Sequence, residues 1–444
     1  MAVIVLRAAV LIGLCCAWGA GASAAEQPNN FYGMFGVGAI RTDNIGLGEI
    51  NRQGETIGVL SADIDLHSVS RHWVLDVISN LQYFLYQHHV YSDELVGNFA
   101  GLARFSIVPE RFDWVAQDNF GQQQIVPGEP VTPNNRENVN YFSTGPDLKW
   151  VFGSRVATQL SGRVSRVSFR TSDLNSNRQS GAFILRYSVD DLSSLSANVT
   201  TERVRYDDSN VNQDFVRNQA FARYQSKTVR LDITADAGSN EVTGLPVVFK
   251  EALWRLKVGH AFTRHTYLEL SAGREITDSG GFLREVQNEG ITTLNFGSIQ
   301  RSSDPFSSRY GRLSWGFERN RTGLRLSAGK YKEDHVLQQN LSHTHSQGDI
   351  GLRRDLTPTL ALEVGGAYTK EDYQDTVANS NSKQYYGALA WRAGSKLTGR
   401  LQVSHIRRNA VRADLGYTDN RVLLMVGWAV GEPMRIARPR SIDQ

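Results

Sequence analysis

The sequence predicts an all-β protein: a single transmembrane antiparallel β-barrel of about 18–20 strands. Twenty is favoured because about twenty strand-like segments can be counted, and bacterial barrels have even strand numbers. Two observations carry this prediction. Segments of about ten residues alternate between apolar and polar side chains along the whole chain, which is the period of a strand between an apolar and a polar environment. The connections between these segments alternate between very short and long, as the two rims of a membrane barrel require.

The clearest alternation lies in residues 228–236. There, Val229, Leu231, Ile233 and Ala235 point one way, and Arg230, Asp232, Thr234 and Asp236 point the other. The same period recurs in residues 195–200, 268–273, 324–329, 360–365 and 397–404. A soluble β-sandwich alternates too, but a soluble chain of 444 residues would normally divide into domains, and no helical block or break interrupts this pattern.

The connections indicate which rim is which. Very short turns are expected near residues 154, 190–191, 263–264, 320–321, 356–357 and 394–395, and we assign them to the periplasmic side. Longer polar connections are expected on the extracellular side. The two longest, residues 120–139 and 278–307, are the candidates for folding into the lumen, since a barrel of this size is wide enough for water unless something fills it.

The first 25 residues have the features of a signal peptide. Arg7 precedes a short apolar run, and Ala22, Ser23 and Ala24 supply small residues for cleavage. Both cysteines, Cys15 and Cys16, lie in this segment, so the mature chain has no thiol for a disulfide or a metal. We therefore predict a signal peptide at 1–25, the barrel at 26–430 and a periplasmic tail at 431–444, with export by a Sec-type route to the outer membrane.

Composition excludes some classes of protein. After residue 25 no apolar run approaches the roughly 20 residues that a membrane-spanning helix needs. The net charge of +3 lacks the strong basic excess that is usual in nucleic-acid binders. Glycine is abundant (40) and proline scarce (11), which suits many strands joined by tight turns.

A search for catalytic or metal-binding groups finds little. None of the ten histidines belongs to a recognisable nucleophile–base motif, and no glycine-rich phosphate loop is present. His88–His89 and the pair His343 and His345 have metal-ligand spacing but fall in or beside expected loops, which favours solvated side chains. We therefore predict that the protein is not an enzyme and binds no cofactor or metal.

Charged residues of the polar face are expected to line the lumen, where they would tune ion selectivity. The alternation places these residues there: Arg163, Arg230, Asp232, Arg255, Lys257, Glu269, Arg312, Arg325, Glu363 and Arg400. Arg136 and Glu137, in the proline- and asparagine-rich connection, are candidates for a constriction. The alternative is that these charges pair with one another and merely fill the interior.

Three stretches resemble a known family when taken together: residues 41–47 (RTDNIGL), 109–123 (PERFDWVAQDNFGQQ) and 133–148 (PNNRENVNYFSTGPDL). They are similar to a family of proteobacterial outer-membrane β-barrel porins that often accompany genes for exopolysaccharide synthesis and export. The resemblance implies a conduit for a secreted polysaccharide working with a periplasmic export protein. It implies no catalytic residues.

The function expected from the sequence is an outer-membrane channel for a polar solute, with secreted exopolysaccharide as the candidate cargo. Two alternatives stay open: a non-conducting scaffold barrel for a periplasmic or electron-transfer partner, and a rim enzyme acting on lipid or glycan. The expected partners are outer-membrane lipid, the barrel-assembly machinery during biogenesis, and the polysaccharide with its export protein. No nucleic-acid partner is expected.

Overall fold

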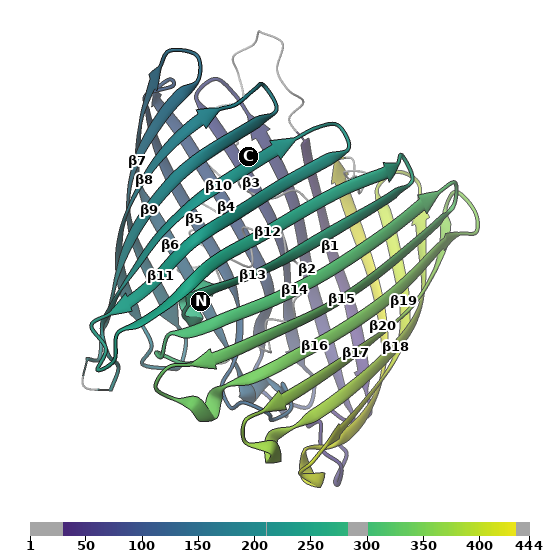
Figure 1. The fold of residues 1–444 in the computed structure, drawn as a ribbon. Coiled ribbons are helices and arrows are strands. Elements are labelled where there is room, and N and C mark those ends of the chain that lie inside the picture. Colours follow the sequence, from purple (N-terminus) through teal and green to yellow (C-terminus); the bar gives the residue numbers. More distant parts are fainter. Residues whose placement is uncertain (1–29, 210, 283–300, 432–444) are drawn as a thin grey trace.

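The computed structural model describes residues 30–209, 211–282 and 301–431, which form one closed antiparallel barrel (Figure 1). Each strand pairs with its neighbours in the chain, and β1 pairs with β20 to close the sheet. The strands are β1 (Asn30–Thr42), β2 (Glu55–Val69), β3 (Trp73–Tyr86), β4 (Glu94–Val108), β5 (Phe112–Gln124), β6 (Arg136–Phe152), β7 (Val156–Phe169), β8 (Ser176–Ser188), β9 (Ser193–Tyr206), β10 (Phe215–Lys227), β11 (Leu231–Thr243), β12 (Phe249–Thr263), β13 (Thr266–Thr277), β14 (Phe306–Arg319), β15 (Thr322–His335), β16 (His343–Asp355), β17 (Leu360–Tyr373), β18 (Ser380–Ala393), β19 (Leu397–Ala410) and β20 (Tyr417–Gly431). This confirms the predicted fold class and the favoured count of twenty.

Short and long connections lie at opposite rims, as expected. The long ones include three 3-10 turns, η3 (Gln339–Leu341), η4 (Thr376–Ala378) and η5 (Ala413–Leu415), which lie along the bottom rim in Figure 1. We call this the extracellular rim and the opposite one the periplasmic rim. The predicted signal peptide at 1–25 and all but the first residue of the predicted tail lie outside the described residues.

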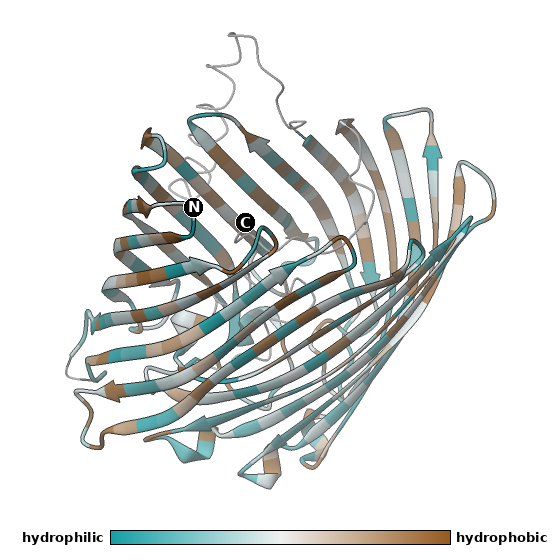
Figure 2. Cartoon of the chain, turned by 45° about the horizontal axis from the view of Figure 1, so that its top comes forward, coloured by the Kyte–Doolittle hydropathy of each residue, from teal (hydrophilic) through white to brown (hydrophobic). Residues whose placement is uncertain are grey.

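The outer surface of the barrel is apolar over the middle of each strand. On β20 the side chains of Val422, Leu424, Val426 and Trp428 are all exposed, while the residues between them face the lumen. Bands of apolar and polar residues alternate along the strands in Figure 2. A belt of this kind needs hydrocarbon around it, and a closed sheet leaves no unpaired strand edge in that hydrocarbon.

Among residues 30–209, 211–282 and 301–431, no helix is long and apolar enough to cross a membrane.

Aromatic rings cover glycines that lie directly opposite them on the next strand. Gly316 of β14 pairs with Tyr267 of β13, and a Cβ on Gly316 would lie 2.1 Å from the tyrosine ring. Gly399 lies in the same way beneath the indole of Trp391. Such pairs cover backbone that glycine would otherwise leave bare and help to set strand register.

We expect Gly316→Ala to destabilise the folded barrel by about 1–3 kcal/mol, because the added methyl group forces the Tyr267 ring out of its place. Urea titration of the barrel in lipid vesicles measures this change. Gly311→Ala on the same strand is the matched control, since a Cβ there meets nothing within 4 Å. Equal stability of the two variants would show that the ring over Gly316 moves aside without cost.

The extracellular end of β13 leaves the wall and turns into the barrel. Pairing between β12 and β13 stops at Trp254 and Arg274, although both strands continue. Beyond that point the carbonyl oxygen of Ile276 accepts hydrogen bonds from Arg217 Nη1 (3.1 Å) and Asn240 Nδ2 (3.0 Å). These two side chains project into the lumen from β10 and β11, so the end of β13 lies inside the ring of strands.

Lumen-facing residues near the extracellular rim form apolar clusters rather than a wet surface. One cluster joins Val204, Phe215, Val242 and Ile276, and another joins Val139 and Tyr141 to Val167 and Phe169. These side chains are buried because connections folded in from the rim cover them. The barrel interior is therefore packed at the extracellular end, where the sequence had suggested a polar face throughout.

Candidate functional site

The connection between β5 and β6, residues 125–135, reaches the opposite stretch of wall. Gly128 in this connection donates its N–H to Tyr373 Oη of β17 (3.1 Å), and its carbonyl accepts from Arg408 Nη2 of β19 (2.5 Å). Strands β1–β4 and β20 separate β5 from β19 along the sheet. The connection therefore lies across the extracellular end of the lumen.

The first residues of the β13–β14 connection are held by a buried ion pair. Nη1 and Nη2 of Arg178 on β8 donate to the two oxygens of the Asp278 carboxylate, at 3.0 and 2.6 Å, and both side chains are only 1% exposed. Burial works to raise the pKa of Asp278, but the Arg178 guanidinium outweighs it and holds that pKa well below its usual range. Next to this pair, Gln123 Nε2 of β5 donates to the Ser279 carbonyl (2.9 Å).

The last residues of the same connection are also attached to the wall. Tyr206 Oη of β9 donates to the Ser303 carbonyl (3.1 Å), and Asp304 accepts from the backbone N–H groups of Leu337 (2.7 Å) and Gln338 (2.8 Å). The two connections that the sequence singled out for their length thus both contact distant strands across the mouth. Their bounds are narrower than expected, because residues 120–124 and 136–139 belong to β5 and β6, and residues 306–307 belong to β14.

Arg136 and Glu137, the candidate constriction residues, are the first two residues of β6. Arg136 forms an ion pair with Glu94 of β4. The Glu137 carboxylate is enclosed and accepts from Thr171 and Ser172, at 2.9–3.1 Å, in the β7–β8 connection. These contacts give both residues a role in holding the rim together, and narrowing of the pore by them stays a prediction.

The expectation that His343 and His345 are solvated loop residues is wrong. They begin β16, face the barrel interior and are each 3% exposed. The imidazole of His343 lies 3.7 Å from Glu333, which also lies 3.3 Å from His335. The physical reason is that β17 encloses them, since the His343 ring stacks on Tyr373 and His345 lies 3.7 Å from Glu371. Among the described residues no group of three or more histidine, cysteine or acidic side chains is arranged to hold a metal ion.

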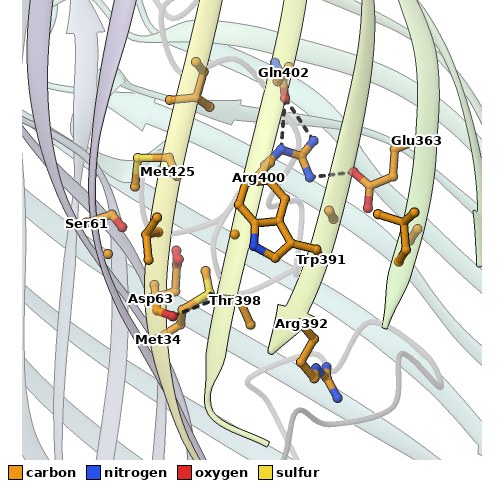
Figure 3. Close-up of a pocket in the computed structure, with 18 of the residues that line it drawn as sticks. Met34, Ser61, Asp63, Glu363, Trp391, Arg392, Thr398, Arg400, Gln402 and Met425 are labelled. Carbon is orange, nitrogen blue, oxygen red and sulfur yellow. Dashed lines mark hydrogen bonds and ion pairs between the residues drawn. The ribbon is translucent and has the colours of Figure 1, made fainter. Parts of the chain in front are cut away.

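The periplasmic half of the lumen contains an open pocket of about 610 Å³. It is bordered by β1–β3, by β16–β20 and by the turn at residues 356–359 (Figure 3). Charged and polar side chains face it, including Asp63, Arg353, Glu363, Arg400 and Gln402. This pocket lies on the periplasmic side of the packed mouth and has room for a small polar solute.

The most organised group in this pocket centres on Glu363 of β17. Its two carboxylate oxygens each accept one hydrogen bond, from Arg353 Nη1 of β16 (2.9 Å) and from Arg400 Nη1 of β19 (2.5 Å). The two arginines lie on opposite sides of β17 along the sheet. Arg400 also donates to the Gln402 side-chain oxygen at 3.1 and 2.9 Å (Figure 3). The group presents guanidinium donors and one carboxylate to the lumen, a set that suits hydroxyl and carboxylate groups of a polar solute.

The register places most of the expected lumen residues on inward-facing positions. These are Arg163, Asp232, Arg255, Lys257, Glu269, Arg312, Arg325, Glu363 and Arg400, on β7, β11–β15, β17 and β19. Arg230 differs, since it lies exposed in the turn before β11. Thr228 causes this, because it closes the turn by bonding with both backbone groups of Leu231.

Several of these charges pair off along the wall. The Asp236 carboxylate receives Arg223 at 2.7 and 2.9 Å and Arg255 at 2.8 Å, and Arg255 continues to Glu275 (3.1 Å). Arg163 pairs with Asp147 at 2.6 Å. The alternative considered from the sequence, that charges fill the interior by pairing, therefore applies to this side of the barrel, whereas Glu363 and its arginines border open space.

Neither the buried Arg178–Asp278 pair nor the reach of Arg408 across the lumen is predictable from the sequence pattern. Arg408 lies on the polar face of an alternating segment, but so do many other arginines, and nothing local distinguishes it. The histidines offered a clearer signal: Glu333 and His335, like His343 and His345, are spaced by two residues, so each pair falls on one face of a strand.

No protein-family model matches the chain, and no curated protein matches its sequence. Solved structures align with most of the chain at low identity. The ferric enterobactin receptor PfeA of Pseudomonas aeruginosa aligns over 92% of this chain and 81% of its own, with 10% identity and a TM-score of 0.46. The FrpB iron transporter of Neisseria meningitidis aligns over 91% and 83%, with 8% identity and a TM-score of 0.47. OccK2 of Pseudomonas aeruginosa aligns over 91% and 98%, with 8% identity and a TM-score of 0.39.

Proposed function

We propose that this protein is an outer-membrane channel for a polar solute. The observation that carries the proposal is a closed barrel with an apolar outer belt and, in its periplasmic half, an open pocket lined by Arg353, Glu363, Arg400 and Gln402. A wide barrel interior with charged walls supports passage of hydrated solutes. The inward connections at the mouth would restrict this passage, so we propose a narrow or gated channel rather than a wide diffusion pore.

The cargo we propose is a secreted polysaccharide, the function that the resemblance of residues 41–47, 109–123 and 133–148 implies. Three arginines at the pocket, Arg353, Arg392 and Arg400, support an acidic glycan over a neutral one, because guanidinium groups bind carboxylates with charge-assisted hydrogen bonds. A periplasmic export protein would deliver the chain to the periplasmic rim.

Single-channel recording in planar bilayers tests this function. We expect discrete conductance steps from the folded barrel, and block of the current by oligosaccharides that contain uronic acids at lower concentrations than by neutral ones of the same length. A preparation that shifts its gel mobility on heating, and is therefore folded, yet carries no current would contradict the channel. It would favour the non-conducting scaffold instead.

A further inference from the structure

A basic patch lies on the outside of the barrel near the extracellular rim. It consists of Arg274 on β13, Arg309 on β14, and Lys330 and Lys332 on β15, which with Trp254 and Gly311 line a hollow of about 440 Å³. Arg309 and Lys332 lie directly opposite each other in the register. Like charges placed opposite each other on neighbouring strands destabilise a sheet, so the arrangement calls for a compensating anion.

Acidic side chains of the wall neutralise this patch only in part. Arg274 pairs with Glu251, and Lys332 lies 2.7 Å from Asp334. Arg309 is 47% exposed and lies 3.9 Å from Glu251 and 3.8 Å from Asp334, carboxylates that already have closer partners. Lys330 is exposed and has no carboxylate partner among the described residues. Four cations thus face two carboxylates, which leaves an excess of two positive charges at the membrane boundary.

An apolar groove continues from the patch toward the middle of the membrane. It is about 590 Å³ in volume and runs over β14–β18, with Leu313, Trp315, Ile350, Tyr368 and Tyr385 as its larger side chains. Small residues at Ala328, Gly348 and Gly366 form its floor. On β14 and β15 the outward positions next to the patch residues Gly311 and Lys330 are Leu313 and Ala328, so the hollow and the groove follow one another along the same strands.

The groove is wide enough for more than one hydrocarbon chain. It crosses five strands, and neighbouring strands lie about 4.8 Å apart, a spacing similar to the width of an extended acyl chain. A second pair of opposed cations, Lys383 on β18 and Arg407 on β19, lies at its far side on the extracellular end. Cations therefore lie at two separated places on the extracellular side of one apolar groove. This arrangement matches a lipid with two phosphates and several acyl chains.

We propose that this outer face is a specific binding site for a bis-phosphorylated, multi-acyl lipid of the outer leaflet, with its phosphates on the basic patch and its chains in the groove. The charge excess recognises the phosphates, since arginine and lysine form charge-assisted hydrogen bonds to phosphate oxygens. The cations lie on the extracellular side of the groove, so the site faces lipids of the outer leaflet. The site is independent of the channel, because it lies on the opposite side of the wall.

Native mass spectrometry of the folded barrel in detergent, titrated with bis-phosphorylated hexa-acyl lipid A, tests the proposal. We expect one tightly bound lipid per barrel, weaker binding of the monophosphorylated form, and no comparable binding of phosphatidylethanolamine. The double variant Lys330→Gln/Lys332→Gln should bind lipid A about 25-fold more weakly, at about fivefold for each cation near a charged lipid surface.

The matched control is Arg203→Gln/Arg205→Gln on β9. These arginines are also exposed, lie two residues apart and point outward near the extracellular rim, but they lie outside the groove. The control should bind lipid A as the unmodified barrel does. An equal loss in both double variants would reveal general charge attraction and overturn the site, as would full binding by Lys330→Gln/Lys332→Gln.

A second variant tests the groove without changing charge. Ala328→Phe fills the floor with a ring, and we expect it to weaken lipid A binding at least tenfold while the heat-dependent gel shift shows that the barrel has folded. Undiminished binding by this variant would overturn the placement of the acyl chains.

Discussion

Asp278→Asn is expected to raise the single-channel conductance of the barrel and to reduce its stability. The substitution removes the carboxylate that compensates the buried Arg178 guanidinium, and loss of one partner of a buried pair costs about 3–5 kcal/mol. The protein can relieve this cost by letting residues 278–282 move away from Arg178 and out of the lumen, which widens the mouth. Conductance in planar bilayers and urea unfolding in vesicles measure the two effects.

Two further variants separate this effect from a general loss of charge at the rim. Asp414→Asn removes the partner of Arg412 in the β19–β20 connection, where both side chains are exposed, and should change neither conductance nor stability. Arg178→Met/Asp278→Leu replaces the buried pair by apolar side chains and should restore the low conductance. Unchanged conductance in Asp278→Asn would contradict a role of this ion pair in holding the mouth.

The same pair predicts how the channel responds to acid. The pKa of Asp278 is lowered in the folded barrel, so its contribution to stability is fully present above the unfolded value of about 3.9 and is lost as the pH falls from there through the lowered folded pKa. Acidification from pH 7 to pH 5 should therefore leave the Arg178–Asp278 contact intact. An opening confined to pH values below about 4, and absent from Arg178→Met/Asp278→Leu, would identify this carboxylate as the group that titrates.

Glu363→Gln is expected to shift the ion selectivity of the channel toward anions. Glu363 is the carboxylate shared by Arg353 and Arg400, so its neutralisation leaves two guanidinium groups facing the pocket. One charge at close range in a water-filled space contributes about 1 kcal/mol, which corresponds to about a fivefold change in the cation-to-anion permeability ratio. The reversal potential in a salt gradient measures this ratio.

Asp372→Asn is the matched control for this selectivity change. Asp372 lies on the same strand, β17, but on the outer side of the wall, where it pairs with Lys370. It should leave the reversal potential unchanged. If the two variants shift the potential equally, or Glu363→Gln leaves it unchanged, the pocket around Glu363 does not lie on the conduction path.

Much of the architecture was predictable because its signals are local. The alternation in residues 360–365 sets which side chains of β17 face the lumen, and it placed Glu363 there without knowledge of any partner strand. The first and last residues of a strand were less predictable where a side chain closes the adjoining turn. Thr228 bonds with Leu231 and delays β11 by three residues relative to the expected start at residue 228, which removes Arg230 from the wall.

The sequence predicted which residues face the candidate site but not how they pair with one another. The sequence placed Arg400 and Glu363 on the lumen side, but the ion pairs that Glu363 shares with Arg353 and Arg400 depend on the register of four strands, β16–β19. The buried histidines were misjudged for a related reason. His343 and His345 stand beside a polar connection in the sequence, and only the pairing of β16 with β17 brings Tyr373 and Glu371 against them.

The sequence by itself determined that this protein is a closed barrel of alternating strands, because the period of two and the lengths of the turns act between neighbouring residues. Only the tertiary structure decided that the mouth is packed. Arg178 and Asp278 lie 100 positions apart, and Arg408 reaches a carbonyl 280 positions away. Closure of the barrel brings such groups together, and many other arginines of the chain have the same local pattern, so no local signal identifies the partners.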